Sequence, residues 1–525
     1  MNAPKPERGG VSQIGKNAFS TVASAGFGTV SSIILDAIVV ARFGMGNQTD
    51  AYFIATTIPI VIMTVLVLQA TRVVQPIFLA KRESESSEAG WEYLRLILTN
   101  GTILVTGVCL AGMALSPLLM RLQTAGSVAE APIASQLSIF LFAFLWLYVP
   151  IAVMRAALNS LGEFAIPGAT KFFENVFKIA FVLMLGGAIG VQALILGALF
   201  GALAQAALFY WMLRRRGFTF RFRFGLAHAD MKRTYGLVSY QLTGQISGIG
   251  VEVFNNAMGS HLGVGNVTAL RLATRIIDSF AGLLPGSVVE AAMPAVARSA
   301  AQRDTAGMKR HLHHTLYLLQ LVTLPLSVWL ALVNRQLIAL LYQRASFSST
   351  DTQLVSTLLF LMIPYLFLGR LRSLFELPFF ATHNTRSPVF ASFVEAVTYV
   401  LSTVLLASRL GVYALPTGRT IAALIGPCVL GWLLRRRIGS LQFGSVWSGA
   451  AKVCAASLVM AACIFLGLSL VDHVPASIGG AKLIALAVPS AIGFGSVVVL
   501  FSMMGVINLS MLRQLDFLRA RRASE

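Results

Sequence analysis

Apolar stretches of roughly 20 residues recur along the whole chain and are separated by short polar segments. A helix of that length crosses a hydrocarbon core about 30 Å thick. About fourteen stretches meet this criterion. They centre near residues 30, 63, 107, 143, 178, 202, 247, 282, 327, 362, 398, 423, 460 and 494. The pattern predicts an all-α polytopic membrane protein with about 14 transmembrane helices.

The composition supports this prediction. Of the 525 residues, 56% are hydrophobic and 12% are charged, and the mean hydropathy is +0.76. A soluble protein of this length could not bury so much apolar surface and would aggregate. The composition therefore argues against a soluble globular protein.

One short phrase of the sequence occurs twice. Residues 44–58 read "GMGNQTDAYFIATTI" and residues 263–277 read "GVGNVTALRLATRII". One residue drops out of the second copy, so that Ile276 corresponds to Ile58, and a proline follows each of these isoleucines 18 positions later, Pro76 in the first copy and Pro294 in the second. The two prolines are 218 positions apart.

A second pair of segments repeats further along the chain. "PGATKFFENV" (167–176) resembles "PVFASFVEAV" (388–397), and each shared residue recurs 221 positions later. Spans one to six thus resemble spans seven to twelve, in parallel orientation. Two such lobes with a pathway between them form a recognised transporter plan. We expect two pseudo-symmetric six-helix lobes plus two C-terminal helices.

This organisation implies six regions of the chain. They are a cytoplasmic N-terminal tail (1–16), an N-lobe (17–214), a basic cytoplasmic linker (215–232), a C-lobe (233–438), a last helix pair (439–510) and a cytoplasmic C-terminal tail (511–525).

The formal net charge of +20 has a topological explanation. Basic residues gather in short segments between apolar stretches, such as "RRRGFTFRFRFGLAHADMKR" (214–233) and "RRRIGS" (435–440), whereas the alternate connections carry little positive charge. This is the positive-inside pattern, which predicts that both termini are cytoplasmic. We expect no nucleic-acid partner; a polybasic site for an acidic partner is the alternative.

Two further features exclude other classes. The N-terminus lacks a short apolar core followed by a small-residue cleavage site, so we expect an uncleaved cytoplasmic tail. The four cysteines lie in apolar stretches without metal-ligand spacing, so we expect small buried hydrophobic residues rather than disulfides or a metal site. They are Cys109, Cys428, Cys454 and Cys463.

Charged residues inside the apolar stretches are the candidates for function, because each costs roughly 2.5 to 3.5 kcal/mol at the centre of a membrane helix. Arg271, Arg275 and Asp278 follow the i, i+4, i+7 spacing of one helical face. The arginines either pair with Asp278 along the helix or project into a cavity that receives an anion. The planar guanidinium suits phosphate because it donates bidentate hydrogen bonds.

Several carboxylates add to this set. Asp36 lies deep in the first span, and Glu252 lies in the polar stretch "GQISGIGVEVFNNAMGS" of the seventh. Both are candidates for a carboxylate coupled to a proton or another cation. Asp50, at the start of the second span, is either a functional acid or a helix N-cap with Thr49.

Two sets of residues have an ambiguous role. Lys171, Glu174 and Lys178 line one face of the fifth span, and Arg372 and Glu376 are spaced i, i+4 on the tenth. Each set either lines a cavity or forms a self-neutralised stripe, because i, i+4 pairs stabilise helices.

The stretch "DAIVVARFGMGNQTDAYFIATTIP" (36–59) resembles the opening of the MurJ/MviN family of lipid II flippases. The resemblance continues through "LRLATRIIDSFAGLLPGSVVEAAMPAVARSAAQRD" (270–304), "LYQRASFSSTDTQLV" (341–355) and "FATHNTRSPVFASF" (380–393). It therefore spans most of the chain. That family belongs to the wider superfamily of multidrug and polysaccharide exporters.

The resemblance implies a function and an architecture. It implies two six-helix lobes around a cationic cavity, with a last helix pair that forms a groove for a polyprenyl tail. It also implies a flippase, not an enzyme, that moves an undecaprenyl-pyrophosphate-linked glycan from the cytoplasmic to the periplasmic leaflet by alternating access. Asp50 and Arg275 match the family's acid and cavity arginine by position.

The remaining expectations follow from the same family. The chain is expected in the bacterial inner membrane as a monomer in contact with membrane lipids. No cofactor is expected, although membrane potential, H⁺ or Na⁺ could drive the step.

The sequence departs from the family at three N-lobe positions. The family's arginines in the first two spans fall at Thr29, Leu35 and near Met63 here. The expected substrate is the lipid II-type peptidoglycan precursor. This loss of positive charge, which Arg271 offsets only in part, shifts some weight to the alternative of a sister substrate such as the lipid-linked repeat unit of an exopolysaccharide or O-antigen.

Three rival functions have different requirements. A cation-coupled drug antiporter needs a pocket of carboxylates and aromatic residues, against which Arg271 and Arg275 argue. A membrane enzyme needs a cluster of catalytic groups in a loop. The histidines His311, His313 and His314 cluster only in a basic segment without carboxylates beside them. A scaffold would not explain costly buried charges.

Overall fold

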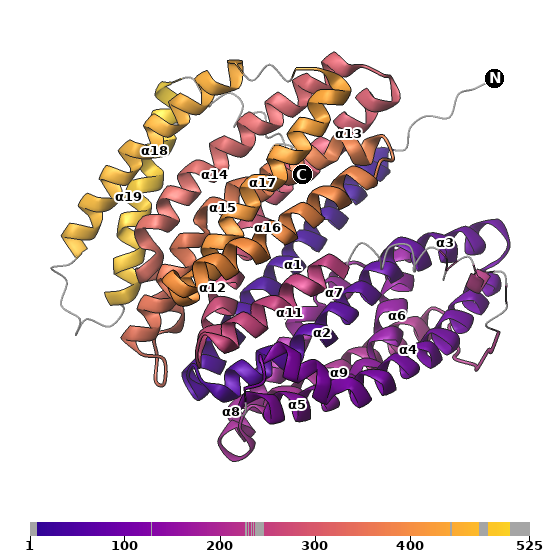
Figure 1. Cartoon of the computed structure of the whole chain (residues 1–525). Coiled ribbons are helices and arrows are strands. Elements are labelled where there is room, and N and C mark those ends of the chain that lie inside the picture. Colours follow the sequence, from indigo (N-terminus) through magenta and orange to yellow (C-terminus); the bar gives the residue numbers. More distant parts are fainter. Residues whose placement is uncertain are drawn as a thin grey trace, which may run out of the picture. The chain divides into compact units, whose positions relative to one another are not determined.

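The computed structural model describes residues 8–127, 129–225, 228, 230–232, 234, 236, 246–440, 444–471 and 481–504. Within these ranges the chain is built from helices joined by short turns and contains no strand (Figure 1). The chain divides into two compact units. Unit 1 comprises residues 1–271 and 344–347, and unit 2 comprises residues 272–343 and 348–525.

The helices of unit 1 begin with a long helix that ends just before the first repeated phrase. They are α1 (Arg8–Phe43), α2 (Asn47–Gln69), η1 (Ala70–Val74), α3 (Gln75–Ser84), α4 (Ser87–Gln123), α5 (Glu130–Leu145), α6 (Tyr148–Ser160), α7 (Ala165–Gly168), α8 (Thr170–Ile189), α9 (Gln192–Arg215) and α11 (Ile246–His261). Within unit 1, α2 packs on α5, α8 on α9 and α11 on α2 and α4.

Helix α12 (Asn266–Ala281) belongs to both units, because the division falls between Arg271 and Leu272. The sequence pattern predicts the boundary between the lobes earlier in the chain, in the basic linker (215–232). That expected division stays a prediction.

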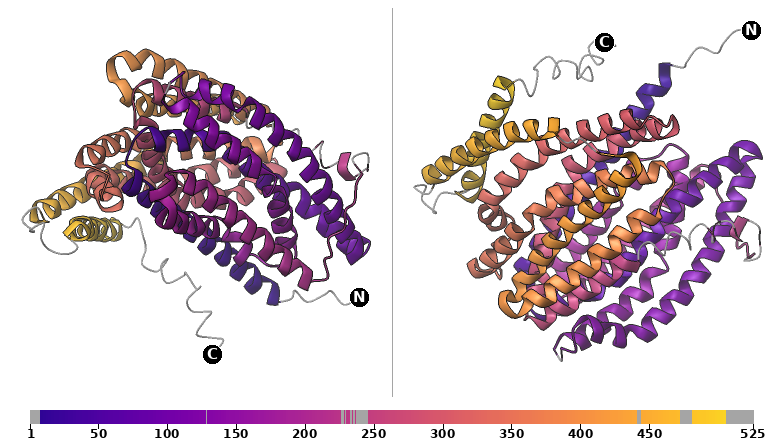
Figure 2. Two further views of the ribbon diagram at one scale, coloured as in Figure 1. Left: turned by 90° about the horizontal axis from the view of Figure 1, so that it is seen from below. Right: turned by 45° about the horizontal axis from the view of Figure 1, so that its top comes forward.

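The helices of unit 2 continue from α12 and end with a pair that packs on α14 (Figure 2). They are η2 (Gly282–Gly286), α13 (Ser287–Ala301), α14 (Thr305–Tyr342), α15 (Ser349–Ala381), α16 (Arg386–Leu410), η3 (Gly411–Tyr413), α17 (Ala414–Ile438), α18 (Gly444–Val471) and α19 (Ala481–Met503). Trp329 of α14 donates its indole N–H to Ser490 of α19 at 2.8 Å. The predicted last helix pair is thus anchored to its own unit.

Eleven stretches of the described residues are long and apolar enough to span a membrane. One of them, residues 386–438, contains both α16 and α17 and so accounts for two predicted spans. The predicted spans near residues 247 and 282 are not among the eleven. Part of the first lies outside the described residues, and the second carries the charged stripe of α12. The fold is nevertheless the expected all-helical membrane protein.

Apolar side chains cover the outer surface of both units. Met184 on α8 is 79% exposed, and Leu405 on α16, which is 221 positions further along, is 75% exposed. Such large exposed apolar surfaces are stable only against lipid or a partner. The expectation of four buried cysteines is wrong: Cys109 is buried, but Cys428 and Cys454 are exposed. These two lie on helix surfaces, where an apolar stretch of a membrane protein can meet acyl chains instead of protein.

The repeat in the sequence is also a repeat in local structure. Ser86 caps α4 by accepting a hydrogen bond from the amide of Ala89 at 3.1 Å, and Asp304, 218 positions later, caps α14 by accepting one from Gly307 at 2.8 Å. A second correspondence, at the spacing of 221, holds at the ends of α9 and α17. There, the Arg215 and Arg436 guanidiniums each lie 3.7 Å from the ring centre of a tryptophan one turn earlier.

Candidate functional site

Asp50 is a fully buried acid in the first repeated phrase. Its Oδ2 accepts the amide hydrogen of Gly265 at 2.6 Å, and its Oδ1 accepts the amide of Thr268 at 2.8 Å and the hydroxyl of Thr268 at 2.5 Å. The amides at the start of a helix have no partner within that helix. Asp50 therefore caps the first turn of α12, in the second repeated phrase.

Asp50 does not cap its own helix, which was one of the two predicted roles. Helix α2 begins after Gly46, whose amide is satisfied by the Thr49 hydroxyl at 2.9 Å. Asp50 lies beyond this cap, so its carboxylate is available to α12. Only the fold brings the two phrases together.

The polar stretch of α11 is held inside unit 1 by side-chain hydrogen bonds. Asn256 donates to Thr57 of α2 and to Gln123 of α4, each at 2.9 Å. Ser260 donates to the backbone oxygen of Thr124 at 3.0 Å and also to the Glu130 carboxylate. The stretch is thus polar because it contacts protein. Glu252, one turn before Asn256, is half-buried on the same helix.

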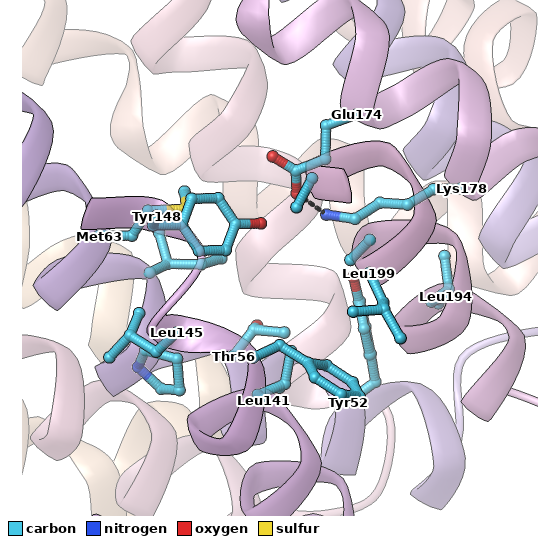
Figure 3. Close-up of a pocket in the computed structure, with 15 residues that line it drawn as sticks. Tyr52, Thr56, Met63, Leu141, Leu145, Tyr148, Glu174, Lys178, Leu194 and Leu199 are labelled. Carbon is cyan, nitrogen blue, oxygen red and sulfur yellow. Dashed lines mark hydrogen bonds and ion pairs between the residues drawn. The ribbon is translucent and has the colours of Figure 1, made fainter. Parts of the chain in front are cut away.

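A cavity of about 40 Å³ lies among α2, α5, α6, α8 and α9 of unit 1 (Figure 3). Lys178 donates to Glu174 at 2.5 Å on its wall, and the hydroxyl of Tyr148 points toward this pair. The remaining wall is mostly apolar and includes Tyr52 and Met63. A cavity of this size has room for water.

The i, i+4 pair of Glu174 and Lys178 predicted on α8 is therefore present, and it also lines a cavity. Both alternatives for this set, a self-neutralised pair and a cavity wall, hold for these two residues. Lys171, in contrast, is exposed. Asp36 on α1 is buried, with 4% of its surface exposed. Lys178 also supplies a cation to the N-terminal half, from which the arginines of the family pattern are missing.

Unit 2 holds an ion cluster around Arg372 of α15. Its guanidinium contacts Glu395 of α16 at 2.7 Å and Glu376 one turn along α15 at 3.0 Å. It also donates to the Ser392 hydroxyl at 2.6 Å. The predicted Arg372–Glu376 pair is present. Glu395 is the repeat counterpart of Glu174, so both repeated glutamates are neutralised by a cation, although the cation comes from a different helix in each unit.

The stripe of α12 meets an arginine that the sequence analysis missed. Arg271 and Arg275 are half-buried, and Asp278 is largely exposed. Arg419 of α17 lies 3.7 Å from the Asp278 carboxylate and donates to the Thr274 hydroxyl at 3.5 Å.

The Arg419 guanidinium also lies over the ring of Tyr365, 4.4 Å from its centre, which holds it in place. The available signal was a single charged residue inside the apolar run "ALPTGRTIAAL" (414–424). The described residues contain no cluster of three or more His, Cys, Asp or Glu side chains able to hold a metal ion.

Comparison with known proteins gives this site a context. Residues 39–478 match the family model described as "Lipid II flippase MurJ". A probable lipid II flippase MurJ of Treponema pallidum is 21% identical over 68% of this chain and 68% of its own length. One from Vibrio cholerae is 22% identical over 76% of this chain and 79% of its own length.

Solved structures share the fold at low sequence identity. A lipid II flippase MurJ in an inward closed conformation superposes with a TM-score of 0.73 at 18% identity, over 93% of this chain and 98% of that one. An inward-facing multidrug resistance MATE transporter superposes with a TM-score of 0.67 at 14% identity, over 81% of this chain and 99% of that one. Since the family model matches well over half of its residues, the chain belongs to the lipid II flippase MurJ family.

Proposed function

We propose that this multi-pass inner-membrane protein is a flippase for an undecaprenyl-pyrophosphate-linked glycan of the lipid II type. It moves this lipid from the cytoplasmic to the periplasmic leaflet by alternating access. Membership of the family, whose curated relatives are named as lipid II flippases, supports this substrate. The observation that carries the proposal is the pair of half-buried arginines on α12.

The chemistry of α12 suits a pyrophosphate headgroup. Guanidinium ions inside a membrane span are costly unless they face water, a counter-ion or a cavity. A pyrophosphate offers several oxygens, and arginine binds such groups through two parallel hydrogen bonds. Arg419 of α17, which reaches Thr274 and Asp278, brings a further guanidinium to α12. No catalytic step is needed, because flipping changes no covalent bond.

The test compares variants in a bacterium whose own flippase is depleted. Arg275→Ala should abolish rescue of growth, and lipid II should accumulate in the cytoplasmic leaflet. Arg275→Lys should restore rescue only in part, because a lysine ammonium cannot form the bidentate contact. Arg409→Ala is the matched control, since this arginine is exposed at the end of α16. Full transport by a correctly inserted Arg275→Ala protein would contradict the proposed role.

The glycan can be tested in the native host. On depletion of this protein, lipid II is the intermediate expected to accumulate on the cytoplasmic side. Accumulation of a lipid-linked exopolysaccharide or O-antigen unit would instead identify the sister substrate, consistent with the lost arginines at Thr29, Leu35 and near Met63. Loss of drug resistance with normal precursor levels would indicate a drug antiporter.

The driving force and topology remain part of the proposal. Asp36 and Glu252 are the carboxylates proposed to couple transport to H⁺ or Na⁺, and membrane potential is the alternative, at about 2.3 kcal/mol per charge per 100 mV. Transport measured with selective ionophores distinguishes these sources. We further propose that the protein is a monomer with both termini cytoplasmic. Measurement of its size in detergent tests the monomer, and reporter fusions at the two termini test the topology.

A further inference from the structure

Unit 2 contains a second cavity, of about 410 Å³, at one end of its helices. It lies where α13, α15 and α17 end and where α14 begins. Two arginines and two threonines line it, together with an apolar floor that includes Met308, Phe379 and Leu434. The polar residues are Arg303, Arg437, Thr305 and Thr382.

The repeat shows what such a space holds in unit 1. There the corresponding helix ends enclose a stack of buried aromatic rings. The centre of the Trp91 ring lies 5.4 Å from that of Phe78 and 5.4 Å from that of Phe218. Phe78 and Phe218 have no exposed surface, and Trp91 is 3% exposed. In unit 1 these helix ends are thus packed with the chain's own aromatic side chains.

None of the three rings has an aromatic counterpart in unit 2. At the spacing of 218, Phe78 corresponds to Val296 and Trp91 to Lys309. At the spacing of 221, which aligns Leu213 with the equally buried Leu434, Phe218 corresponds to Gly439. The Lys309 ammonium lies 3.7 Å from the point where a β-carbon on Gly439 would stand. Small and cationic residues thus replace the aromatic filling.

The electrostatics of this end favour an anion. Arg435 and Arg436 precede Arg437 on α17, and Lys309 and Arg310 lie on the first turns of α14. Asp304, the acid next to Arg303, is engaged as the cap of α14 and lies 3.7 Å from Arg310. Arg437 lies over the Phe379 ring, 5.4 Å from its centre, which places its charge beside the apolar floor.

We propose that this cavity binds the phosphate headgroup of an anionic phospholipid. The guanidiniums of Arg303 and Arg437 would bind the phosphate, and the floor of Met308, Phe379 and Leu434 would accept the adjoining glycerol and first methylene groups. A phosphate-bearing lipid fits better than free phosphate because most of the floor is apolar. The basic end is the one that the positive-inside rule assigns to the cytoplasmic leaflet, where anionic lipids are found.

The binding test uses the purified full-length protein in micelles of a neutral detergent without added lipid. Native mass spectrometry and thermal shift are recorded with dioctanoyl-phosphatidylglycerol, dioctanoyl-phosphatidylcholine and inorganic phosphate. Phosphatidylglycerol should bind and raise the melting temperature, whereas the other two probes should have little effect. An equal shift with inorganic phosphate would overturn the lipid assignment, and an equal shift with phosphatidylcholine would overturn the role of the charges.

Two variants and one control test whether the lipid binds in this cavity. Arg303→Asn combined with Arg437→Ala should weaken phosphatidylglycerol binding about tenfold or more. Asparagine is chosen because Arg303 has a φ of +55°, which asparagine tolerates. Ala300→Phe should block binding by filling the cavity while both arginines remain. Arg216→Ala, at the repeat counterpart of Arg437, should leave binding unchanged because this guanidinium is paired with Glu163.

The outcomes separate this site from non-specific attraction to a basic surface. Equal loss in Arg216→Ala and in the double variant would contradict the proposal. So would unchanged binding in Ala300→Phe, provided that the variant melts within a few degrees of the wild-type protein.

Discussion

The carboxylate of Asp50 and the hydroxyl of Thr268 lie 2.5 Å apart, although 218 positions separate them in the chain. This is the spacing of the repeat itself. Asp50 is the residue of the first phrase that the second phrase omits, and Thr268 is the counterpart of Thr49. The first phrase therefore supplies a carboxylate that the second lacks, and the start of α12 depends on it for its cap.

Asp50→Ala is expected to loosen the start of α12. It leaves the buried amides of Gly265 and Thr268 without their acceptor, at a cost of about 1–3 kcal/mol for each unsatisfied group. Hydrogen exchange at these two amides should accelerate, and the melting temperature should fall. Thr268→Val is the matched control, since it removes the hydroxyl but keeps both amide bonds. Unchanged exchange in Asp50→Ala would contradict this role.

The ion pair in the unit 1 cavity predicts a non-additive pair of mutations. Lys178→Met alone leaves the Glu174 carboxylate without its cation in a mostly apolar cavity, and losses of about 3–5 kcal/mol are typical for such buried pairs. The double variant with Glu174→Gln should be more stable than Lys178→Met. Thermal unfolding in detergent measures this coupling. Lys452→Met, at an exposed site on α18, should change stability little; equal losses in both lysine variants would refute the argument.

Arg372→Lys is expected to destabilise unit 2 although it keeps the charge. The guanidinium reaches Glu376, Glu395 and Ser392 together because it carries several donors in one plane, whereas an ammonium is a single point. We expect a loss of about 1–3 kcal/mol, the cost of leaving a buried group unsatisfied. The control is the melting curve of the Arg335→Lys variant, which changes an arginine on α14. If the Arg372→Lys variant melts at the wild-type temperature, the contacts shared by this guanidinium contribute little to stability.

Close packing of α8 on α9 depends on a glycine. A β-carbon added to Gly197 would stand 2.5 Å from the α-carbon of Lys178, which is too close for any side chain. Gly197→Val should force the helices apart and reduce the yield of folded protein, since membrane helices use small residues where their backbones approach. Gly107→Val is the control because no atom lies within 4 Å of its added β-carbon. Equal yields of both variants would contradict this prediction.

Features that depend on neighbours along the chain were predictable from the sequence. Helix positions follow from apolar length, and the Glu174–Lys178 and Arg372–Glu376 pairs follow from the helical period, because residues four apart share a face. The repeat and the family resemblance could also be recognised, because both are comparisons of sequence with sequence. Each of these inferences needs no knowledge of which helices touch.

Only the tertiary structure decided which distant groups meet. Asp50 caps a helix that begins more than 200 positions later, and Arg419 reaches Thr274 on another helix. The cavity beside Arg437 lies between the ends of helices that are far apart in the sequence. Contacts of this kind depend on how helices pack, and many packings satisfy the same apolar pattern. The pattern therefore determined the helices, and the packing determined the partners of their polar side chains.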